Sequence, residues 1–192
     1  MAKQKLLLVD GSSLAFRAFF SILDLNRFKN ANGLHTNALY SFHRMFKSIL
    51  DSEKPTHVLV AWDAGKTTFR TEMYADYKGG RSKTPGEFIE QMPYFNVLLD
   101  AWGIPHYRLN QYEADDIIGT LARKGEEAGY EVVVLSGDKD LIQLADNNIT
   151  VKITTKGVTE LVEYTPEVIF EKYGLTPEQI IDMKGLMGDS SD

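Results

Sequence analysis

The chain has no cysteine and no long apolar run among its 192 residues. Without cysteine, disulfides and thiolate metal sites are excluded. A membrane-spanning helix needs roughly 20 apolar residues in a row, and no run approaches that length. The basic start MAKQK is followed by only a short apolar run before Asp10, which is too little for a signal peptide. We therefore expect a cytoplasmic protein that has no membrane partner.

Several familiar catalytic patterns are missing as well. The chain has no Walker A loop, and no G-x-G-x-x-G follows its first apolar run. The segment Asp10-Gly-Ser-Ser lacks the Thr-x-Thr companion of an aspartyl-phosphate enzyme. Histidine is scarce and has no metal-ligand spacing, so we interpret all four residues as structural: His35, His43, His57 and His106.

Negative charge dominates the composition, with a formal net charge of −6, but it is unevenly distributed. Residues 25–50 contain no acid, and residues 25–84 hold ten Lys or Arg against five Asp or Glu. Such a chain can present a basic surface to phosphates beside an acidic site. An ordinary solvated face explains the charge equally well, so the charge alone leaves both interpretations open.

Apolar strand patterns alternate with helical patterns along the chain. The strand-like segments are 5–9, 57–62, 105–109, 131–136 and 148–153. The helical patterns are 12–23, 37–51, 86–101 and 113–128. This alternation predicts an α/β protein of three layers, in which a mostly parallel central sheet carries helices on both faces.

Local signals predict where some elements begin and end. Residues 84–87 (TPGE) and 176–179 (TPEQ) are capping-box patterns with proline at the first helical position. Gly129 is placed to end a helix, and Lys156-Gly157 predicts a small hairpin. The segment 64–84 has neither a helical nor a strand period, and long irregular segments of this kind are often functional.

Acidic residues follow the predicted strands. Three strand-like runs end in aspartate, at Asp10, Asp63 and Asp138, and Glu113-Ala-Asp115-Asp116 opens a predicted helix. One such residue is most often a helix cap or a turn former, and a helix start favours acids. The joint pattern indicates more, because the carboxyl edge of an open α/β sheet is where ligands bind.

Carboxylates gathered at one edge need cations. Two bare charges roughly 4 Å apart repel by about 4 kcal/mol at an effective dielectric of about 20. All candidate ligands are oxygen donors, which select Mg²⁺, Mn²⁺ or Ca²⁺ over zinc or copper. Two such ions beside a basic segment fit phosphodiester hydrolysis, in which a metal-bound water supplies hydroxide and both ions stabilise the reacting oxygens.

The motifs resemble a known family. LLLVDGSSLAFRAFF, AWDAGKTTFR, YKGGR, YEADDIIGTLA, SGDKDLIQL and GLMGDSSD occur in this order along nearly the whole chain. Together they resemble the 5′ nuclease, or 5′→3′ exonuclease, domain of bacterial DNA polymerase I. That domain belongs to the flap-endonuclease superfamily and has a PIN-like fold. Any one of these motifs alone would be weak, whereas the ordered set is specific.

The resemblance implies two metal ions, Mg²⁺ with Mn²⁺ as a substitute. Carried over by position, the first ion would be bound by Asp10, Asp63, Glu113, Asp115 and Asp116. The second would be bound by Asp138, Asp140, Asp189 and Asp192. Because the last two lie where the chain stops, the first site is expected to be the better formed.

The resemblance also assigns the basic residues. The segment 64–84 would be the base of an arch through which the 5′ end of single-stranded DNA passes. Lys78 and Arg81 would be catalytic, and the DNA-binding residues would be Arg70, Tyr77, Lys78, Arg81 and Lys83. Tyr77 could stack on an unpaired base, with core packing as the alternative. The stripe Leu14, Phe16, Phe19 and Phe20 is predicted to be mostly core, although residues after Asp10 line the DNA-binding face in relatives.

The implied activity is that of a 5′→3′ exonuclease and structure-specific 5′-flap endonuclease. Its partners would be DNA with a 5′ flap, nick or 5′ end, and RNA primer–DNA hybrids, in primer removal and nick-translation repair. The chain would be a monomeric part of a nucleoid-associated polymerase. Residues 1–175 would form the nuclease core, and 176–192 would begin a truncated helix-hairpin-helix region. A stand-alone flap nuclease, a PIN-type ribonuclease and a non-enzymatic acidic binding module remain alternatives.

Overall fold

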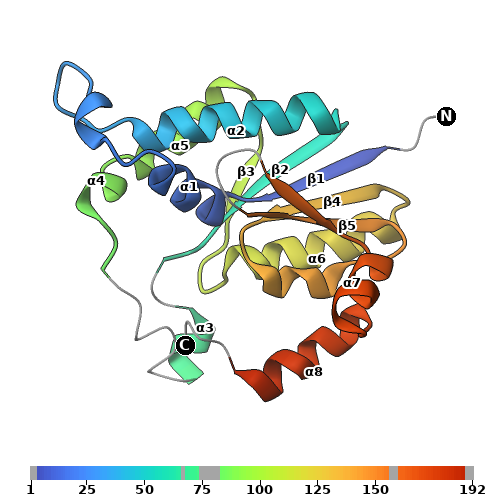
Figure 1. The fold of residues 1–192 in the computed structure, drawn as a ribbon. Coiled ribbons are helices and arrows are strands. Elements are labelled where there is room, and N and C mark those ends of the chain that lie inside the picture. The colour runs from blue at the N-terminus through green and yellow to red at the C-terminus, as the bar shows by residue number, and fades with distance from the viewer. Residues whose placement is uncertain (1–3, 66–67, 74–82, 156–159, 189–192) are drawn as a thin grey trace.

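A computed structural model describes residues 4–65, 68–73, 83–155 and 160–188 of the chain. The strands of its sheet are β1 (Lys5–Asp10), β2 (His57–Trp62), β3 (His106–Arg108), β4 (Glu131–Ser136), β5 (Ile149–Thr154) and β6 (Leu161–Tyr164). Their spatial order is β3-β2-β1-β4-β5-β6 (Figure 1). All neighbours are parallel except β5 and β6, which are antiparallel. The predicted α/β fold with a mostly parallel sheet is confirmed.

Helices cover both faces of this sheet. The α-helices are α1 (Gly11–Phe20), α2 (Asn37–Glu53), α3 (Phe69–Met73), α4 (Gly86–Ile89), α5 (Met92–Ala101), α6 (Ala114–Glu127), α7 (Pro166–Tyr173) and α8 (Pro177–Met187). Two 3₁₀ helices are η1 (Leu25–Arg27) and η2 (Lys139–Leu144). One face packs against α1, α2, α4 and α5, and the other against α6, η2, α7 and α8 (Figure 1). In the described part of the chain no helix is both long and apolar enough to cross a membrane.

Each central strand is buried on both sides. Leu7 and Val9 of β1 belong to the core under α1 and α2, whereas Leu8 belongs to the core under α6. Successive side chains of a strand point to opposite faces, so a strand with both faces covered is apolar throughout. This is why LLLV and VVVL read as continuous runs in the sequence.

The strand register brings the carboxyl ends of three strands together. β1 lies between β2 and β4; Asp10 pairs with Ala61 of β2, and Val9 pairs with Leu135 of β4. In a parallel sheet, aligned strands end at the same edge. The residues that follow β1, β2 and β4 therefore start from neighbouring points, which positions the site described below.

The predicted helix 86–101 is in fact two helices. α4 ends at Ile89 and α5 begins at Met92, with Pro93 in its first turn. Proline has no N–H to donate to the carbonyl four residues earlier, so a continuous helix would lose that hydrogen bond. The capping box predicted at residues 84–87 is also wrong, because Pro85 is the N-cap and no side chain caps the helix.

Other local predictions are confirmed. Residues 176–179 form a capping box at the start of α8. Gly129 follows α6 with φ of +86°, a left-handed conformation that favours glycine. The strands β5 and β6 pair as the two arms of a hairpin. The predicted turn residues Lys156 and Gly157 lie outside the described residues.

The break between α4 and α5 buries a polar side chain. Gln91 is fully buried, and its Oε1 accepts the N–H groups of Ala38 (3.0 Å) and Leu39 (3.3 Å) at the start of α2. Its Nε2 donates to Asn37 Oδ1 (2.9 Å). The first N–H groups of a helix have no partner within it, and the side chain of the N-cap Thr36 does not accept a hydrogen bond from them. Gln91 therefore caps α2 from another element.

Replacing Gln91 by alanine should destabilise the protein by about 1–3 kcal/mol, because buried N–H groups would lose their acceptor. Urea unfolding followed by circular dichroism measures this. The matched control is Gln4→Ala, which removes the same side chain from an exposed position and should change stability by less than about 0.5 kcal/mol. Equal effects of the two changes would show that the Gln91 contacts contribute nothing.

Candidate active site

Acidic residues from three strands and one helix meet at the carboxyl edge of the sheet. Asp10 is the last residue of β1, Asp63 directly follows β2, and Asp138 comes two residues after β4. Glu113 and Asp115 stand at the start of α6. The topology thus places these acids at one edge, as the sequence pattern predicted.

Asp10 is a buried carboxylate with two hydrogen-bond donors. It is 4% exposed, and its Oδ1 accepts the N–H of Ser13 (2.9 Å) as the N-cap of α1. Its Oδ2 accepts the hydroxyl of Ser136 (2.7 Å). The pKa of Asp10 is raised to about 6, chiefly by burial and to a smaller extent by Asp63 and Asp138, while the two hydrogen bonds oppose the rise. The helix-cap role and the place in an acidic cluster therefore coexist in one residue.

Asp63 connects the end of β2 to the start of α6. Its N–H donates to Ser12 Oγ (3.0 Å), and its Oδ1 accepts the N–H of Ala114 (2.8 Å). The carboxylate is thus held at the amino end of a helix, where the macrodipole favours negative charge.

The first turn of α6 brings in three more acids. Glu113 is the N-cap and is 8% exposed, and its N–H donates to Asp116 Oδ2 (3.0 Å) in a capping box. Asp115 is half-buried, and its pKa is raised to about 8, chiefly by burial and further by repulsion from Asp10, Asp138, Asp63 and Glu113. These four acids are therefore close enough to act on the ionisation of Asp115, and the five together form one cluster.

Asp116 and Asp140 lie beside this group and have basic partners. Arg70 of α3 donates to both oxygens of Asp116, at 2.8 and 2.7 Å. Lys184 of α8 forms an ion pair with Asp140 Oδ1 at 2.7 Å. A cavity of about 430 Å³ opens here, lined among others by Arg70, Asp115, Asp116 and Asp140. Arg70, predicted to bind DNA, thus has an acidic partner within the protein.

The donor set of the five-acid cluster fits a hard divalent cation. All of its side-chain ligand atoms are carboxylate oxygens. Burial first, and then repulsion from the neighbouring acids, raises the pKa of Asp10 to about 6 and the pKa of Asp115 to about 8, so both bind protons more tightly than an exposed aspartate does. A cation among them would replace those protons and remove the repulsion. Within the described ranges, no three acidic or histidine side chains already surround a point in metal-ligand geometry. Binding would therefore draw carboxylates inward.

Several predicted site residues lie outside the described residues, namely Tyr77, Lys78, Arg81, Asp189 and Asp192. Lys83 is described and is exposed, ahead of α4. The metal-binding, catalytic or DNA-binding roles of all six residues remain predictions.

Two aromatic residues of α1 that the sequence predicts to lie in the core are in fact on the surface, next to the acids. Leu14 and Phe19 are buried as predicted, but Phe16 and Phe20 are 45% and 49% exposed. Their rings stack edge to face with centroids 4.8 Å apart. The prediction failed because the four apolar residues wrap around more than one side of a short helix. Only those facing the sheet and α2 are covered.

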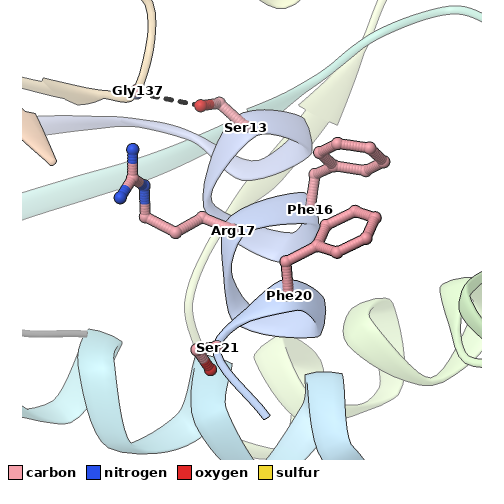
Figure 2. A pocket seen from close by; sticks show the side chains of 6 residues that line it. All are labelled: Ser13, Phe16, Arg17, Phe20, Ser21 and Gly137. Atoms are coloured by element: carbon pink, nitrogen blue, oxygen red, sulfur yellow. Dashed lines mark hydrogen bonds between the residues drawn. The ribbon is translucent and has the colours of Figure 1, made fainter. Parts of the chain in front are cut away.

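Arg17 lies on the same helix and was missed by the sequence reasoning. It lines a cavity of about 370 Å³ with Ser13, Phe16, Phe20, Ser21 and Gly137 (Figure 2). Its guanidinium donates to the carbonyl of Thr155, and Ser13 Oγ accepts the N–H of Gly137 (2.8 Å). A single basic residue on an otherwise apolar helix directly after Asp10 was the signal that could have found it.

This architecture is that of the 5′ nucleases. The phage T5 5′-exonuclease, in a structure described with bound divalent zinc ions, matches with a TM-score of 0.72 and 26% identity over 98% of this chain and 68% of that one. Flap endonuclease-1 from Methanococcus jannaschii shares the fold with a TM-score of 0.58 and 19% identity, over 98% of this chain and 65% of that one. The mostly parallel sheet with its helices is thus the PIN-like fold of this class.

The chain belongs to the family described as "5′-3′ exonuclease, N-terminal resolvase-like domain", whose model matches residues 5–174. DNA polymerase I of Bacillus subtilis (strain 168) is 62% identical over 190 residues, which are 99% of this chain and 21% of that protein. DNA polymerase I of Streptococcus pneumoniae (strain ATCC BAA-255 / R6) is 61% identical over 193 residues, which are 100% of this chain and 22% of that protein. The chain is a nuclease domain that spans about a fifth of the length of these curated relatives.

The raised pKa values of Asp10 (about 6) and Asp115 (about 8) make the metal-free protein less stable as pH rises. Above the ordinary pKa of 3.8 the unfolded chain loses these protons while the folded chain keeps them. The stability that these two groups contribute is therefore greatest below that value and is lost as pH rises through about 6 and about 8. Urea unfolding in the presence of a chelator, from about pH 5 to pH 8, measures the decline.

Asp115→Asn should flatten this decline, chiefly above about pH 6, because the amide does not titrate. The control Asp100→Asn, at a side chain that is 71% exposed, should leave the decline unchanged. A stability that stays constant or rises over this range in the unsubstituted protein would contradict the assignment of buried, mutually repelling acids.

Proposed function

We propose that this chain is the N-terminal part of a bacterial DNA polymerase I and acts on DNA with Mg²⁺. It hydrolyses phosphodiester bonds as a 5′→3′ exonuclease and as a 5′-flap endonuclease, in primer removal and nick-translation repair. The observation that carries this proposal is the cluster of Asp10, Asp63, Glu113, Asp115 and Asp138 at the carboxyl edge of the sheet. The T5 relatives support it, since one is described in a complex with DNA and metal ions at 25% identity and a TM-score of 0.70.

The acids divide into two groups. Asp10, Asp63, Glu113, Asp115 and Asp116 would hold one ion. Asp138, Asp140, Asp189 and Asp192 would hold the other, with Asp115 between the two. Bound ions of this kind lower the pKa of a water and stabilise the attacking and leaving oxygens of an in-line displacement. Mn²⁺ would substitute for Mg²⁺, because both prefer carboxylate oxygens.

The protein's own residues fix the carboxylates before a substrate arrives. The N–H of Ala114 donates to Asp63, and the N–H of Ser13 donates to Asp10, so both carboxylates have one oxygen held by backbone. A carboxylate has about four lone-pair sites, so the one donor to Asp63 and the two donors to Asp10 leave capacity for a cation. Once a cation has drawn the carboxylates inward, these hydrogen bonds would help to hold them in place during the reaction.

We expect DNA to be bound by α1 and by residues of the segment 64–84. On α1, the exposed rings of Phe16 and Phe20 offer a stacking surface for bases, and Arg17 adds a positive charge. The segment 64–84 would supply Tyr77, Lys78, Arg81 and Lys83. Lys78 and Arg81 would neutralise charge on the scissile phosphate in the transition state. Arg70 would anchor α3 at the base of this segment through Asp116, and would reach DNA only after that pair opens.

The C-terminal part would add duplex binding. Residues 176–192 would begin a helix-hairpin-helix region, of which α8 is the described part; its buried Ile180 packs against the core under α6. The working form would be a monomer at the bacterial nucleoid, in which the rest of the polymerase follows this domain.

Asp63→Ala should reduce cleavage of 5′-flap DNA in Mg²⁺ by at least about 100-fold, because metal ions contribute several kcal/mol to transition-state stabilisation and each 1.36 kcal/mol is tenfold in rate. The rate is measured for this chain and for a form extended beyond Asp192, under single-turnover conditions. Asp100→Ala, which removes an exposed acid paired with His106, is the control and should cut normally.

Undiminished cutting by the Asp63 variant would overturn the assignment of the site. Single-stranded RNA is the comparison substrate: faster cleavage of RNA than of DNA flaps would favour a PIN-type ribonuclease instead.

A further inference from the structure

Three serine hydroxyls hold the backbone next to the acids. Ser12 Oγ accepts the N–H of Asp63 (3.0 Å), and Ser13 Oγ accepts the N–H of Gly137 (2.8 Å). Ser136 Oγ accepts the N–H of Asp138 (3.0 Å). The loops after β2 and β4 are thus attached to the start of α1 and to the end of β4 itself.

Ser136 differs from the other two because it also donates to a carboxylate. Its hydroxyl lies 2.7 Å from Asp10 Oδ2, and the residue is 1% exposed. A serine hydroxyl has one proton and two lone pairs. Since the N–H of Asp138 occupies a lone pair, the single proton is available to Asp10. Ser136 therefore bridges Asp10, at the end of β1, and the loop after β4, which carries Asp138.

This bridge connects the two acids geometrically. Asp10 ends β1, and Asp138 comes two residues after the neighbouring strand β4. The Ser136 hydroxyl lies against Asp10 Oδ2 at 2.7 Å. The N–H contact fixes where the loop of Asp138 leaves the sheet, and Asp138 Oδ1 in turn accepts the N–H of Asp140 (2.8 Å). One buried hydroxyl thus contacts both the carboxylate of Asp10 and the backbone of Asp138, two acids assigned to different ions.

We propose that Ser136 is a positioning residue for the divalent cations, holding the Asp10 carboxylate and the Asp138 loop at the spacing that both ions require. This inference rests on the proposed function, since it needs a cation between these acids. Groups that hydrogen-bond to metal ligands typically contribute 10–100-fold to metal affinity. Ser136 itself touches neither substrate nor metal.

The test compares Ser136→Ala with the unsubstituted chain by calorimetric titration of Mn²⁺ alone. The dissociation constant should rise about 10–100-fold. In single-turnover cleavage of flap DNA, the rate of the variant should fall at limiting Mn²⁺ and recover when Mn²⁺ is raised, with the affinity for DNA unchanged. A residue that only supports the fold would not produce a loss that metal concentration restores.

The matched control is Ser41→Ala. Ser41 is 3% exposed, lies on α2, and shares a hydroxyl contact of 2.7 Å with Ser21. Its replacement removes a comparable buried hydroxyl and should leave Mn²⁺ affinity unchanged. Should Ser136→Ala fail to fold in a thermal melt, Ser136→Cys, with a weaker donor of similar shape, should still raise the dissociation constant.

The possible results distinguish a failure of the Ser136 inference from a failure of the proposed function. Equal Mn²⁺ affinity of the Ser136 variant and the unsubstituted chain would overturn this inference and leave the proposed function standing. Equal losses in the Ser136 and Ser41 variants would also overturn it. If the unsubstituted chain bound no Mn²⁺, the proposed function and this inference would fall together.

Discussion

Repulsion between carboxylates at one edge of a parallel sheet is the constraint on which the rest of this structure depends. Parallel strands in aligned register end together, so acids that follow β1, β2 and β4 cannot avoid one another. The amino end of α6 adds Glu113 and Asp115 to the same edge. Burial, together with repulsion from the neighbouring acids, raises the pKa of Asp115 to about 8.

The fold offsets this repulsion with local donors and cations. Backbone N–H groups donate to Asp10 and Asp63, and Arg70 and Lys184 pair with the flanking Asp116 and Asp140. One acid can therefore have both a structural and a functional role: Asp10 caps α1 and also belongs to the acidic cluster. The raised pKa values of Asp10 and Asp115 show that negative charge at this edge remains unfavourable, and a hard divalent cation is a suitable partner for it.

The sequence could predict the fold because the governing signals are local or periodic. Buried parallel strands read as apolar runs, and acids that directly follow such runs must share an edge. The break between α4 and α5 was missed because one proline in the first turn of α5 outweighs a helical pattern spread over sixteen residues. Gln91 was missed because its partners belong to α2, more than fifty residues earlier.

In the site, too, local patterns could be predicted and contacts between distant residues could not. Which acids gather could be predicted from strand order, whereas Ser136 and Arg17 act through contacts between residues more than 120 positions apart. Phe16 and Phe20 were assigned to the core because apolar character alone does not tell which side of a short helix is covered. Resemblance to a family supplied roles for Lys78 and Arg81, which no local pattern in this chain indicates.

The most direct test of the central claim is anomalous diffraction from crystals of this chain soaked in Mn²⁺. The account predicts a peak enclosed by carboxylates of Asp10, Asp63, Glu113 and Asp115, with these side chains drawn inward. It also predicts that any second peak lies next to Asp138. A map with no peak at this edge of the sheet, at Mn²⁺ concentrations that support cleavage, would contradict it.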